Sequence, residues 1–178
     1  MYKVTKYPDG SSYVDTDTLP YETVRINSYE DLWHLHQLVD AKNNMGITPT
    51  INIPNLLDAQ ADRRFKNGQS TGARLVLELL ATMDATFQIF HPHNPEIVEA
   101  ICKNVSISDN TGFIKRVMEK MKPRFEKGDG RLIFMSPDAG AFKSLSKTLD
   151  AIGWNGEMYS ATKARTFEDF KTKLVQQV

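Results

Sequence analysis

Residues 131–145, RLIFMSPDAGAFKSL, contain the change from strand to helix that decides the fold class. Leu132 to Ser136 have the composition of a buried strand, and apolar residues recur at helical spacing from Phe142 to Ile152. Asp138 stands at the junction. A carboxylate at such a point can hold a divalent cation or sugar hydroxyls, because open α/β sheets build ligand sites at strand ends. Asp is equally a preferred helix N-cap, and spacing alone favours that simpler role.

Strand and helix patterns alternate along the rest of the chain. This alternation predicts a three-layer α/β fold, in which a mostly parallel sheet has helices on both faces, with a β-hairpin before it. The hairpin is predicted over residues 1–17, around Pro8-Asp9-Gly10. The further strands are predicted at 47–53, 86–90, 131–136 and 157–161, and the helices at 28–46, 70–83, 96–103, 110–125 and 140–152, with a last amphipathic segment at 166–175.

Composition excludes several classes of partner. The 22 Lys and Arg residues balance 22 Asp and Glu residues, so no global positive field would collect nucleic acid or an anionic membrane. The single cysteine, Cys102, excludes an intramolecular disulfide and a zinc site of several thiolates. The sequence shows neither a signal peptide nor an apolar run long enough for a membrane span. We therefore expect a cytoplasmic protein with no nucleic-acid or membrane partner.

Two polar clusters follow two of the predicted strands. In the first, residues 58–68, Asp62 is followed by three cations and a glycine, a composition that can bind phosphate. The second, residues 91–94, contains His91 and His93 beside a predicted helix start. A solvated charged loop and a half-buried histidine are the simpler explanations of these clusters. The carboxyl ends of parallel strands meet at one edge of a sheet, so we expect both clusters to share a crevice with the strand end at Asp138.

A further cationic cluster, residues 162–165, follows the predicted strand at 157–161. Lys163 and Arg165 in a loop could close over a phosphoryl group during transfer, where stabilisation of developing charge supplies most of the catalysis. The alternative is a solubilising turn before the last segment.

Taken together and in this order, the clusters resemble those of ribose-phosphate diphosphokinases, also called phosphoribosyl pyrophosphate synthetases, and especially the divergent branch carried by bacteriophages. The resemblance covers most of the chain and implies a phosphoribosyltransferase-like fold that uses Mg²⁺ and ATP. It rests on the segments KYPDGSSYV, NIPNLLDAQADRRF, HPHNPEIVEA, MSPDAGAFK and TKAR. It also implies an ATP-binding domain over residues 1–128 and the start of a second α/β domain over 129–178.

The resemblance assigns a role to particular residues. It implies that Tyr7 and Asp9, in a flag-like hairpin, contact the adenine of ATP bound to a neighbouring subunit, so the chain should form a homo-oligomer. The further ATP-binding residues implied are Gln60, Asp62, Arg63 and His93. The resemblance places magnesium near His93 and Asp138, with Asp138 also facing the ribose. Lys163 and Arg165 are the implied catalytic residues, on a mobile loop.

The chain departs from the family pattern at four points. Gln60 stands where the family usually has an arginine that grips ATP, and His91 stands where it usually has an acid. Nothing in the sequence matches the family's first strand and helix. The sequence ends at Val178, before the loop that cradles the 5-phosphate of the sugar substrate, so the resemblance is to a truncated member.

Three functional hypotheses follow. The first is an enzyme of nucleotide or NAD metabolism that transfers the β,γ-diphosphoryl group of Mg-ATP to ribose 5-phosphate or to an acceptor such as ADP-ribose; if phage-encoded, it would act in the host cytoplasm. The second is a catalytically inactive homologue that binds nucleotide or regulates a complete synthetase. The third is an unrelated phosphate-binding α/β domain.

Overall fold

The computed structural model describes residues 2–126, 128, 132–165 and 172–175, the last two strands and residues 125–126 by their backbone only. The chain forms two compact units, Met1–Asp109 and Asn110–Val178. Helix α4 therefore groups with the second unit. The family domains expected at 1–128 and 129–178 stay a prediction, since a compact unit and a family domain are different things.

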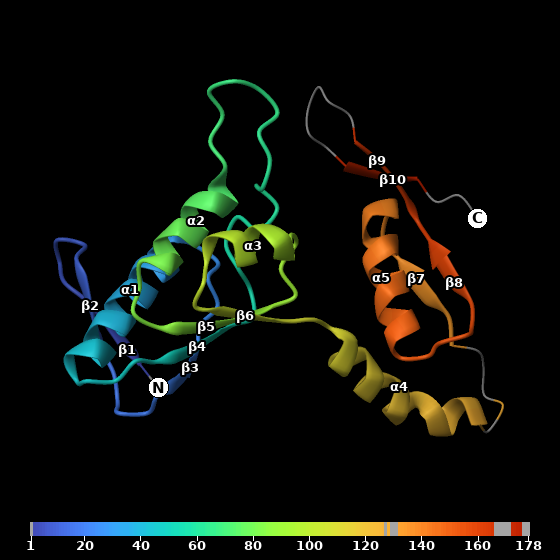
Figure 1. Ribbon diagram of the computed structural model, residues 1–178, viewed down its shortest axis with the longest axis horizontal. Coiled ribbons are helices and arrows are strands. Elements are labelled where there is room, and N and C mark those ends of the chain that lie inside the picture. Colours follow the sequence, from blue (N-terminus) through green and yellow to red (C-terminus); the bar gives the residue numbers. More distant parts are fainter. Residues whose placement is uncertain (1, 127, 129–131, 166–171, 176–178) are drawn as a thin grey trace. The chain divides into compact units, whose positions relative to one another are not determined.

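The first unit contains a hairpin, a sheet and three helices (Figure 1). Strands β3 to β6 form a parallel four-stranded sheet in the order β3-β4-β5-β6. The mostly parallel α/β fold and the N-terminal hairpin predicted from the sequence are confirmed. The elements are β1 (Lys3–Lys6), β2 (Ser12–Asp15), β3 (Tyr21–Thr23), α1 (Tyr29–Asn44), β4 (Thr50–Ile53), α2 (Gly72–Ala81), β5 (Thr86–Phe90), α3 (Pro95–Ile101) and β6 (Val105–Ser108).

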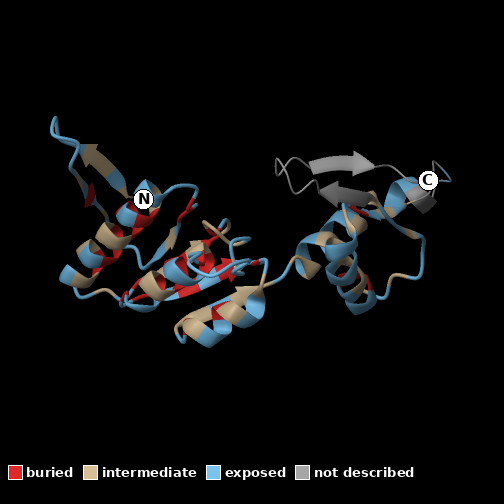
Figure 2. Ribbon diagram, turned by 90° about the horizontal axis from the view of Figure 1, so that it is seen from above, coloured by how far each residue is buried: buried red, intermediate tan, exposed pale blue. Residues whose placement is uncertain are grey.

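The hydrophobic core lies between this sheet and its helices (Figure 2). Ile51, Ile53, Phe87 and Ile89 alternate along β4 and β5 and are fully buried. Right-handed crossovers between consecutive parallel neighbours place the connecting helices on one face of the sheet. The residues between the buried ones are more exposed, so within this unit the opposite face of the sheet is open.

The hairpin of β1 and β2 is antiparallel and pairs Val4 with Val14. Its turn closes where Tyr7 N–H donates to the Ser11 carbonyl at 2.8 Å, and Gly10 has a φ of 88°, which a glycine adopts without strain. Ser12 attaches the hairpin to α1, because its Oγ lies 3.1 Å from His34 Nε2.

A buried lysine fixes the chain between the hairpin and the sheet. Lys42 of α1 is fully buried, and its Nζ donates to the Leu19 carbonyl at 2.6 Å and the Asp17 carbonyl at 2.9 Å. The same ammonium lies 3.3 Å from a carboxylate oxygen of Glu22, whose side chain is 8% exposed. A buried charge is tolerated only when it is paired and hydrogen-bonded, so these contacts explain how Lys42 occupies the interior.

The second unit contains α4 (Thr111–Glu126), β7 (Phe134–Ser136), α5 (Ala139–Ala151), β8 (Met158–Ser160), β9 (Thr162–Arg165) and β10 (Thr172–Val175). Strands β7 and β8 are parallel and α5 connects them, which makes a βαβ unit. Phe134 and Trp154 pack edge to face, with ring centroids 5.3 Å apart.

The structure corrects three expectations from the sequence. Strands β3 and β6, the two edges of the sheet, were not predicted. Residues 162–165, expected in a loop, form β9, which pairs antiparallel with β10. The predicted last amphipathic segment falls partly at 166–171, outside the described residues, and its remainder is strand β10.

Cys102 belongs to the core. Its thiol is buried and donates to the Leu77 carbonyl at 3.2 Å, and burial raises the pKa of this thiol.

None of the described helices is both long enough and apolar enough to cross a membrane.

Candidate functional site

Two loops at the carboxyl end of the sheet bring charged side chains together. One loop joins β4 to α2 and carries Asp62 and Arg63; the other joins β5 to α3 and carries His93. His93 Nδ1 lies 3.7 Å from Asp62 Oδ2, and Arg63 Nε lies 3.9 Å from Asp62 Oδ1. The structure therefore brings together three residues that the resemblance assigns to ATP binding.

Asn94 holds Asp62 in this arrangement. Its Nδ2 donates to Asp62 Oδ2 at 3.1 Å, while its Oδ1 accepts from the Ile97 N–H at 3.3 Å as the N-cap of α3. Asn followed by Pro is a typical sequence pattern of a helix N-cap and first helical position, but this pattern gives no sign of the bond to Asp62. The amide thus joins the start of α3 to the β4–α2 loop.

The β5–α3 turn has an unusual backbone. His91 has a φ of 45°, in the left-handed region that residues other than glycine seldom adopt. Its N–H donates to the Ser108 carbonyl at 2.7 Å. Strained residues persist only where the surroundings hold them, and here the bond to the end of β6 does so. This turn sets the direction in which the chain reaches His93.

A second acidic group lies in the β4–α2 loop. Asp58 has a φ of 56°, and its Oδ2 accepts from the Tyr29 hydroxyl at 2.8 Å, a bond that raises the pKa of Tyr29. A Cβ at Gly72, the first residue of α2, would lie 2.5 Å from that carboxylate oxygen, so a larger residue here would displace the Asp58 side chain. The carboxylate is thus seated against the helix start, where negative charge is favourable. Sequence reasoning missed this contact; the glycine at the helix start was its only signal.

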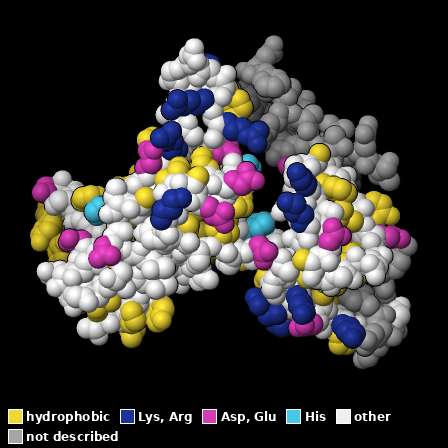
Figure 3. Space-filling model, viewed as in Figure 1, with side chains coloured by type: hydrophobic (Ala, Val, Ile, Leu, Met, Phe, Trp, Pro, Cys, Tyr) yellow, Lys and Arg dark blue, Asp and Glu magenta, His cyan; other side chains and the backbone are white. Residues whose placement is uncertain are grey.

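Basic side chains gather on the loop between β4 and α2 (Figure 3). Arg64 Nε donates to Thr71 Oγ1 at 3.2 Å, and Arg74 Nε donates to Glu78 Oε1 at 2.6 Å. A shallow hollow of about 310 Å³ lies beside them, lined by Arg64, Ser70, Thr71, Arg74, Leu75 and Glu78. Arginine forks of this kind suit phosphate oxygens.

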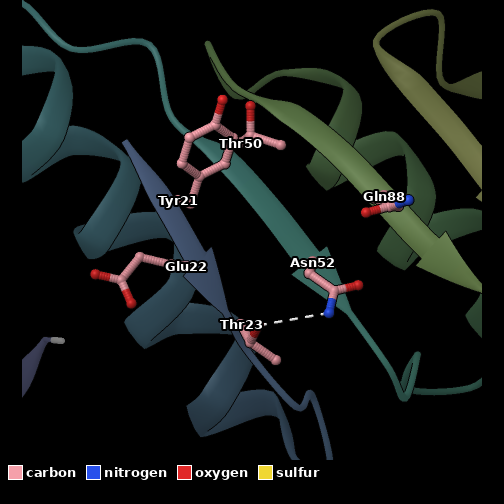
Figure 4. A pocket seen from close by; sticks show the side chains of 6 residues that line it. All are labelled: Tyr21, Glu22, Thr23, Thr50, Asn52 and Gln88. Atoms are coloured by element: carbon pink, nitrogen blue, oxygen red, sulfur yellow. Dashed lines mark hydrogen bonds between the residues drawn. The ribbon is translucent and has the colours of Figure 1, made fainter. Parts of the chain in front are cut away.

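A second hollow, of about 250 Å³, lies on the open face of the sheet (Figure 4). Figure 4 shows Thr50, Asn52 and Gln88 in front of the strands, with the helices behind, and the Glu22 side chain beside β3. Asn52 donates to Thr23 Oγ1 at 3.4 Å. The lining residues are Tyr21, Glu22, Thr23, Thr50, Asn52 and Gln88. It contains none of the residues that the sequence assigned to a site.

Similarity to known proteins agrees with the resemblance seen in the sequence. No family model matches the chain. The ribose-phosphate pyrophosphokinase of Sulfurisphaera tokodaii is 29% identical over 161 residues, which are 82% of this chain and 52% of the relative. That of Pyrococcus abyssi is 26% identical over 160 residues, 85% of this chain and 53% of the relative. The chain is thus similar to ribose-phosphate pyrophosphokinases over most of its length.

The similarity to these ribose-phosphate pyrophosphokinases is distant, and the chain spans about half the length of the curated relatives it matches. The fold agrees as well. A crystal structure of phosphoribosylpyrophosphate synthetase from Mycobacterium smegmatis superimposes on 100% of this chain and 59% of that chain, with a TM-score of 0.70 and 18% sequence identity.

The hairpin residues that the pyrophosphokinase resemblance assigns to adenine lie in the turn and in the segment that enters it. Tyr7 is exposed and packs against Tyr13 in a tilted arrangement, with ring centroids 5.5 Å apart and ring planes at 41°. Asp9 accepts from the Ser11 hydroxyl at 2.7 Å and from its N–H at 2.9 Å, which lowers the pKa of Asp9. Both residues are therefore presented to solvent by a well-bonded turn.

Asp138 is the N-cap of α5, and its Oδ1 accepts from the Ala141 N–H at 2.8 Å. The sequence predicted that Asp138 would share one parallel sheet with Asp62 and His93. That prediction is wrong, because Asp138 follows β7, which belongs to another sheet in the second unit. Its assignment to magnesium and ribose stays a prediction.

The structure gives less detail on the other residues that the resemblance assigns to the site. Gln60 is exposed on the β4–α2 loop. Lys163 and Arg165 lie in β9, opposite Leu174 and Thr172 of β10, and their side chains are outside the described part of the structure. Among the described residues, no group of three or more His, Cys, Asp or Glu side chains could hold a metal ion. Magnesium bound through ATP phosphates needs only one or two protein carboxylates, so this finding is compatible with Mg-ATP.

Proposed function

We propose that this chain is a diphosphokinase-like protein that binds Mg-ATP at the carboxyl end of the β3–β6 sheet. The observation that supports this most is the cluster of Asp62, Arg63 and His93, contributed by two loops of one parallel sheet edge. Such edges are where open α/β sheets bind nucleotides. The two ribose-phosphate pyrophosphokinases named above support the same class of ligand.

The exposed groups of the cluster fit a polyphosphate. Arg63, whose side chain is 75% exposed, offers a planar fork for two phosphate oxygens, and the neighbouring loop adds Arg64 and Lys66. His93 is half-exposed beside it. Because the transferred group carries its own charge and metal ion, the protein has chiefly to position it and to neutralise negative charge.

We propose that the acceptor is a ribose 5-phosphate or a ribosyl nucleotide such as ADP-ribose, whose anomeric hydroxyl receives the β,γ-diphosphoryl group and releases AMP. Asp138 would serve magnesium and ribose, and Lys163 and Arg165 would stabilise the transferred group. Tyr7 and Asp9 would complete the ATP site of a neighbouring copy, which requires self-association.

Two measurements test the proposal in sequence. Calorimetry should detect Mg-ATP binding, and Arg63→Ala should weaken it about 10-fold or more, the loss of one charge-assisted contact. Arg124→Ala, an exposed arginine in the last turn of α4, is the matched control. Absence of ATP and ADP binding at millimolar concentration would refute the proposal.

AMP release with ribose 5-phosphate or with ADP-ribose then distinguishes catalysis from binding alone. We expect release with one of the two acceptors and none with ATP by itself. Nucleotide binding without AMP release from either acceptor would favour the non-catalytic homologue. Sedimentation that shows only monomer at micromolar concentration would contradict the role of the hairpin.

A further inference from the structure

The members of the candidate site differ sharply in exposure. The side chain of Asp62 is 4% exposed, whereas those of His93 and Arg63 are 49% and 75% exposed. A ligand as large as a nucleotide can contact the two exposed groups, but almost none of the carboxylate surface is available to it. A carboxylate in direct contact with phosphate oxygens would also repel them.

We propose that Asp62 is a positioning residue and not a nucleotide ligand: its buried carboxylate fixes the His93 imidazole and the Arg63 guanidinium, and Asn94 fixes the carboxylate. This inference rests on the proposed function for the identity of the ligand, but the arrangement itself can be tested in the free protein.

Contacts with the starts of two helices, α3 and α2, hold Asp62 and the residue before it in place. The Asn94 amide bonds it to the start of α3, and the preceding residue, Ala61, accepts a backbone hydrogen bond from Ala73 of α2 at 3.2 Å. The carboxylate therefore has a fixed place relative to two helices. This placement separates it from a surface acid, whose orientation is free.

The two oxygens of the carboxylate then face different basic side chains. Oδ2, already bonded to Asn94, faces His93 Nδ1 at 3.7 Å, and Oδ1 faces Arg63 Nε at 3.9 Å. These distances exceed those of hydrogen bonds and are in the range of ion pairs, and such contacts often tighten when a ligand binds. A carboxylate facing Nδ1 favours the proton on that nitrogen and leaves Nε2 as the nitrogen for the ligand.

The first test uses Asp62→Asn, which preserves the shape of the side chain and removes its charge. We expect the ¹⁵N signals of the His93 ring in the ligand-free protein to shift away from the Nδ1–H tautomer, and Mg-ATP affinity to fall about 10- to 100-fold. Asp84→Asn is the matched control, because Asp84 is exposed just before the amino end of β5, whereas His93 follows its carboxyl end. It should leave both readouts unchanged.

The second test changes Asn94 while keeping the helix cap. Asn, Asp and Ser are similarly good N-caps, so Asn94→Asp and Asn94→Ser should both fold. Asn94→Asp places a carboxylate against Asp62 Oδ2 and should disturb the His93 signals and ATP affinity more than Asn94→Ser, which only loses the donor. Equal behaviour of the two variants would show that the amide does not hold Asp62.

The outcomes separate this inference from the proposed function. Unchanged His93 signals in Asp62→Asn would overturn the positioning role, and if ATP binding were lost in that same variant, Asp62 would be a direct ligand. If the unmodified protein bound no ATP, the proposed function would fail, while the His93 signals of the free protein would still confirm or overturn the positioning role.

Discussion

The two units each carry an aspartate in the segment that joins a parallel strand to the next helix, and the two carboxylates are used differently. Asp138 bonds to Ala141 of its own helix, as an N-cap. Asp62 bonds to Asn94, from the next loop along the sheet edge, and faces His93 of that loop. An acid after a strand is thus not in itself a site. In the first unit, groups of a second loop along the sheet edge converge on the carboxylate.

The comparison suggests that the two units have different roles, and the largest expected effect, on turnover, tests this. If the first unit binds the nucleotide and β9 of the second unit acts in diphosphoryl transfer, Lys163→Ala and Arg165→Ala should each lower turnover by two to three powers of ten, which corresponds to about 3–4 kcal/mol. The affinity for ATP should stay nearly unchanged. AMP-release kinetics with parallel calorimetry measure both quantities. Lys147→Ala, at an exposed position on α5, is the control. Unmodified turnover in the double variant would remove β9 from the reaction.

The next effect concerns binding in the first unit alone. Gln60→Arg restores the arginine that the resembled family has at this exposed position and should tighten Mg-ATP binding by about 1.5–3 kcal/mol through one charge-assisted contact. Asn67→Arg adds the same charge to another exposed position of the same loop and should have a much smaller effect. If both substitutions tighten binding equally, the loop attracts ATP only through its total charge.

Substitution of Asp138 tests directly whether the two aspartates have different roles. Asp138→Ala removes the N-cap of α5 and should destabilise the second unit by about 0.5–2 kcal/mol, whereas Asp138→Ser keeps a capping oxygen and should be close to the unmodified protein. Denaturant unfolding measures the difference. Turnover separates the two roles, because a magnesium or ribose ligand would not be replaced by serine. Recovery of both stability and turnover in Asp138→Ser would leave Asp138 as a cap only.

The smallest effect concerns Asp9, which, like Asp138, is held by its own neighbours. Hydrogen bonds from Ser11 lower the pKa of Asp9, so its contribution to the hairpin is present above the unfolded pKa of about 3.9 and is lost as the pH falls through the folded value. Ser11→Ala should raise the pKa of Asp9 toward its ordinary value, which a ¹³C carboxyl titration can follow. Identical titration curves would show that the turn in solution lacks these bonds.

Local signals in the sequence predicted the elements that depend on local interactions. The hairpin follows from Pro8-Asp9-Gly10, and the strand predicted at 86–90 and the helix predicted at 96–103 agree with β5 and α3 to within two residues. The edge strands β3 and β6 were missed because they have three and four residues and take their hydrogen bonds from β4 and β5, which are distant in sequence. Strand β9 was expected to be a loop because Lys163 and Arg165 suggested a phosphate-binding turn, whereas these residues pair with β10.

The candidate site could also be predicted from the sequence only in part. Sequence order places Asp62, Arg63 and His93 at one sheet edge, because the carboxyl ends of parallel strands meet there. Two contacts could not be derived from it. The N-cap pattern accounts for only one end of the Asn94 amide, and the Tyr29–Asp58 bond depends on a backbone φ of 56° at Asp58. Asp138 was misplaced because consecutive strands were assigned to one sheet, whereas the chain forms two units.

The buried pair of Lys42 and Glu22 has an evolutionary consequence. Loss of the ammonium alone would break this pair at a carboxylate that is 8% exposed. Breaking a buried ion pair costs about 3–5 kcal/mol in typical proteins, a large part of a total stability of about 5–15 kcal/mol. Joint replacement by apolar residues costs far less. Positions 22 and 42 should therefore drift together through the descendants of this chain, and a lineage that has lost one charge should have lost the other.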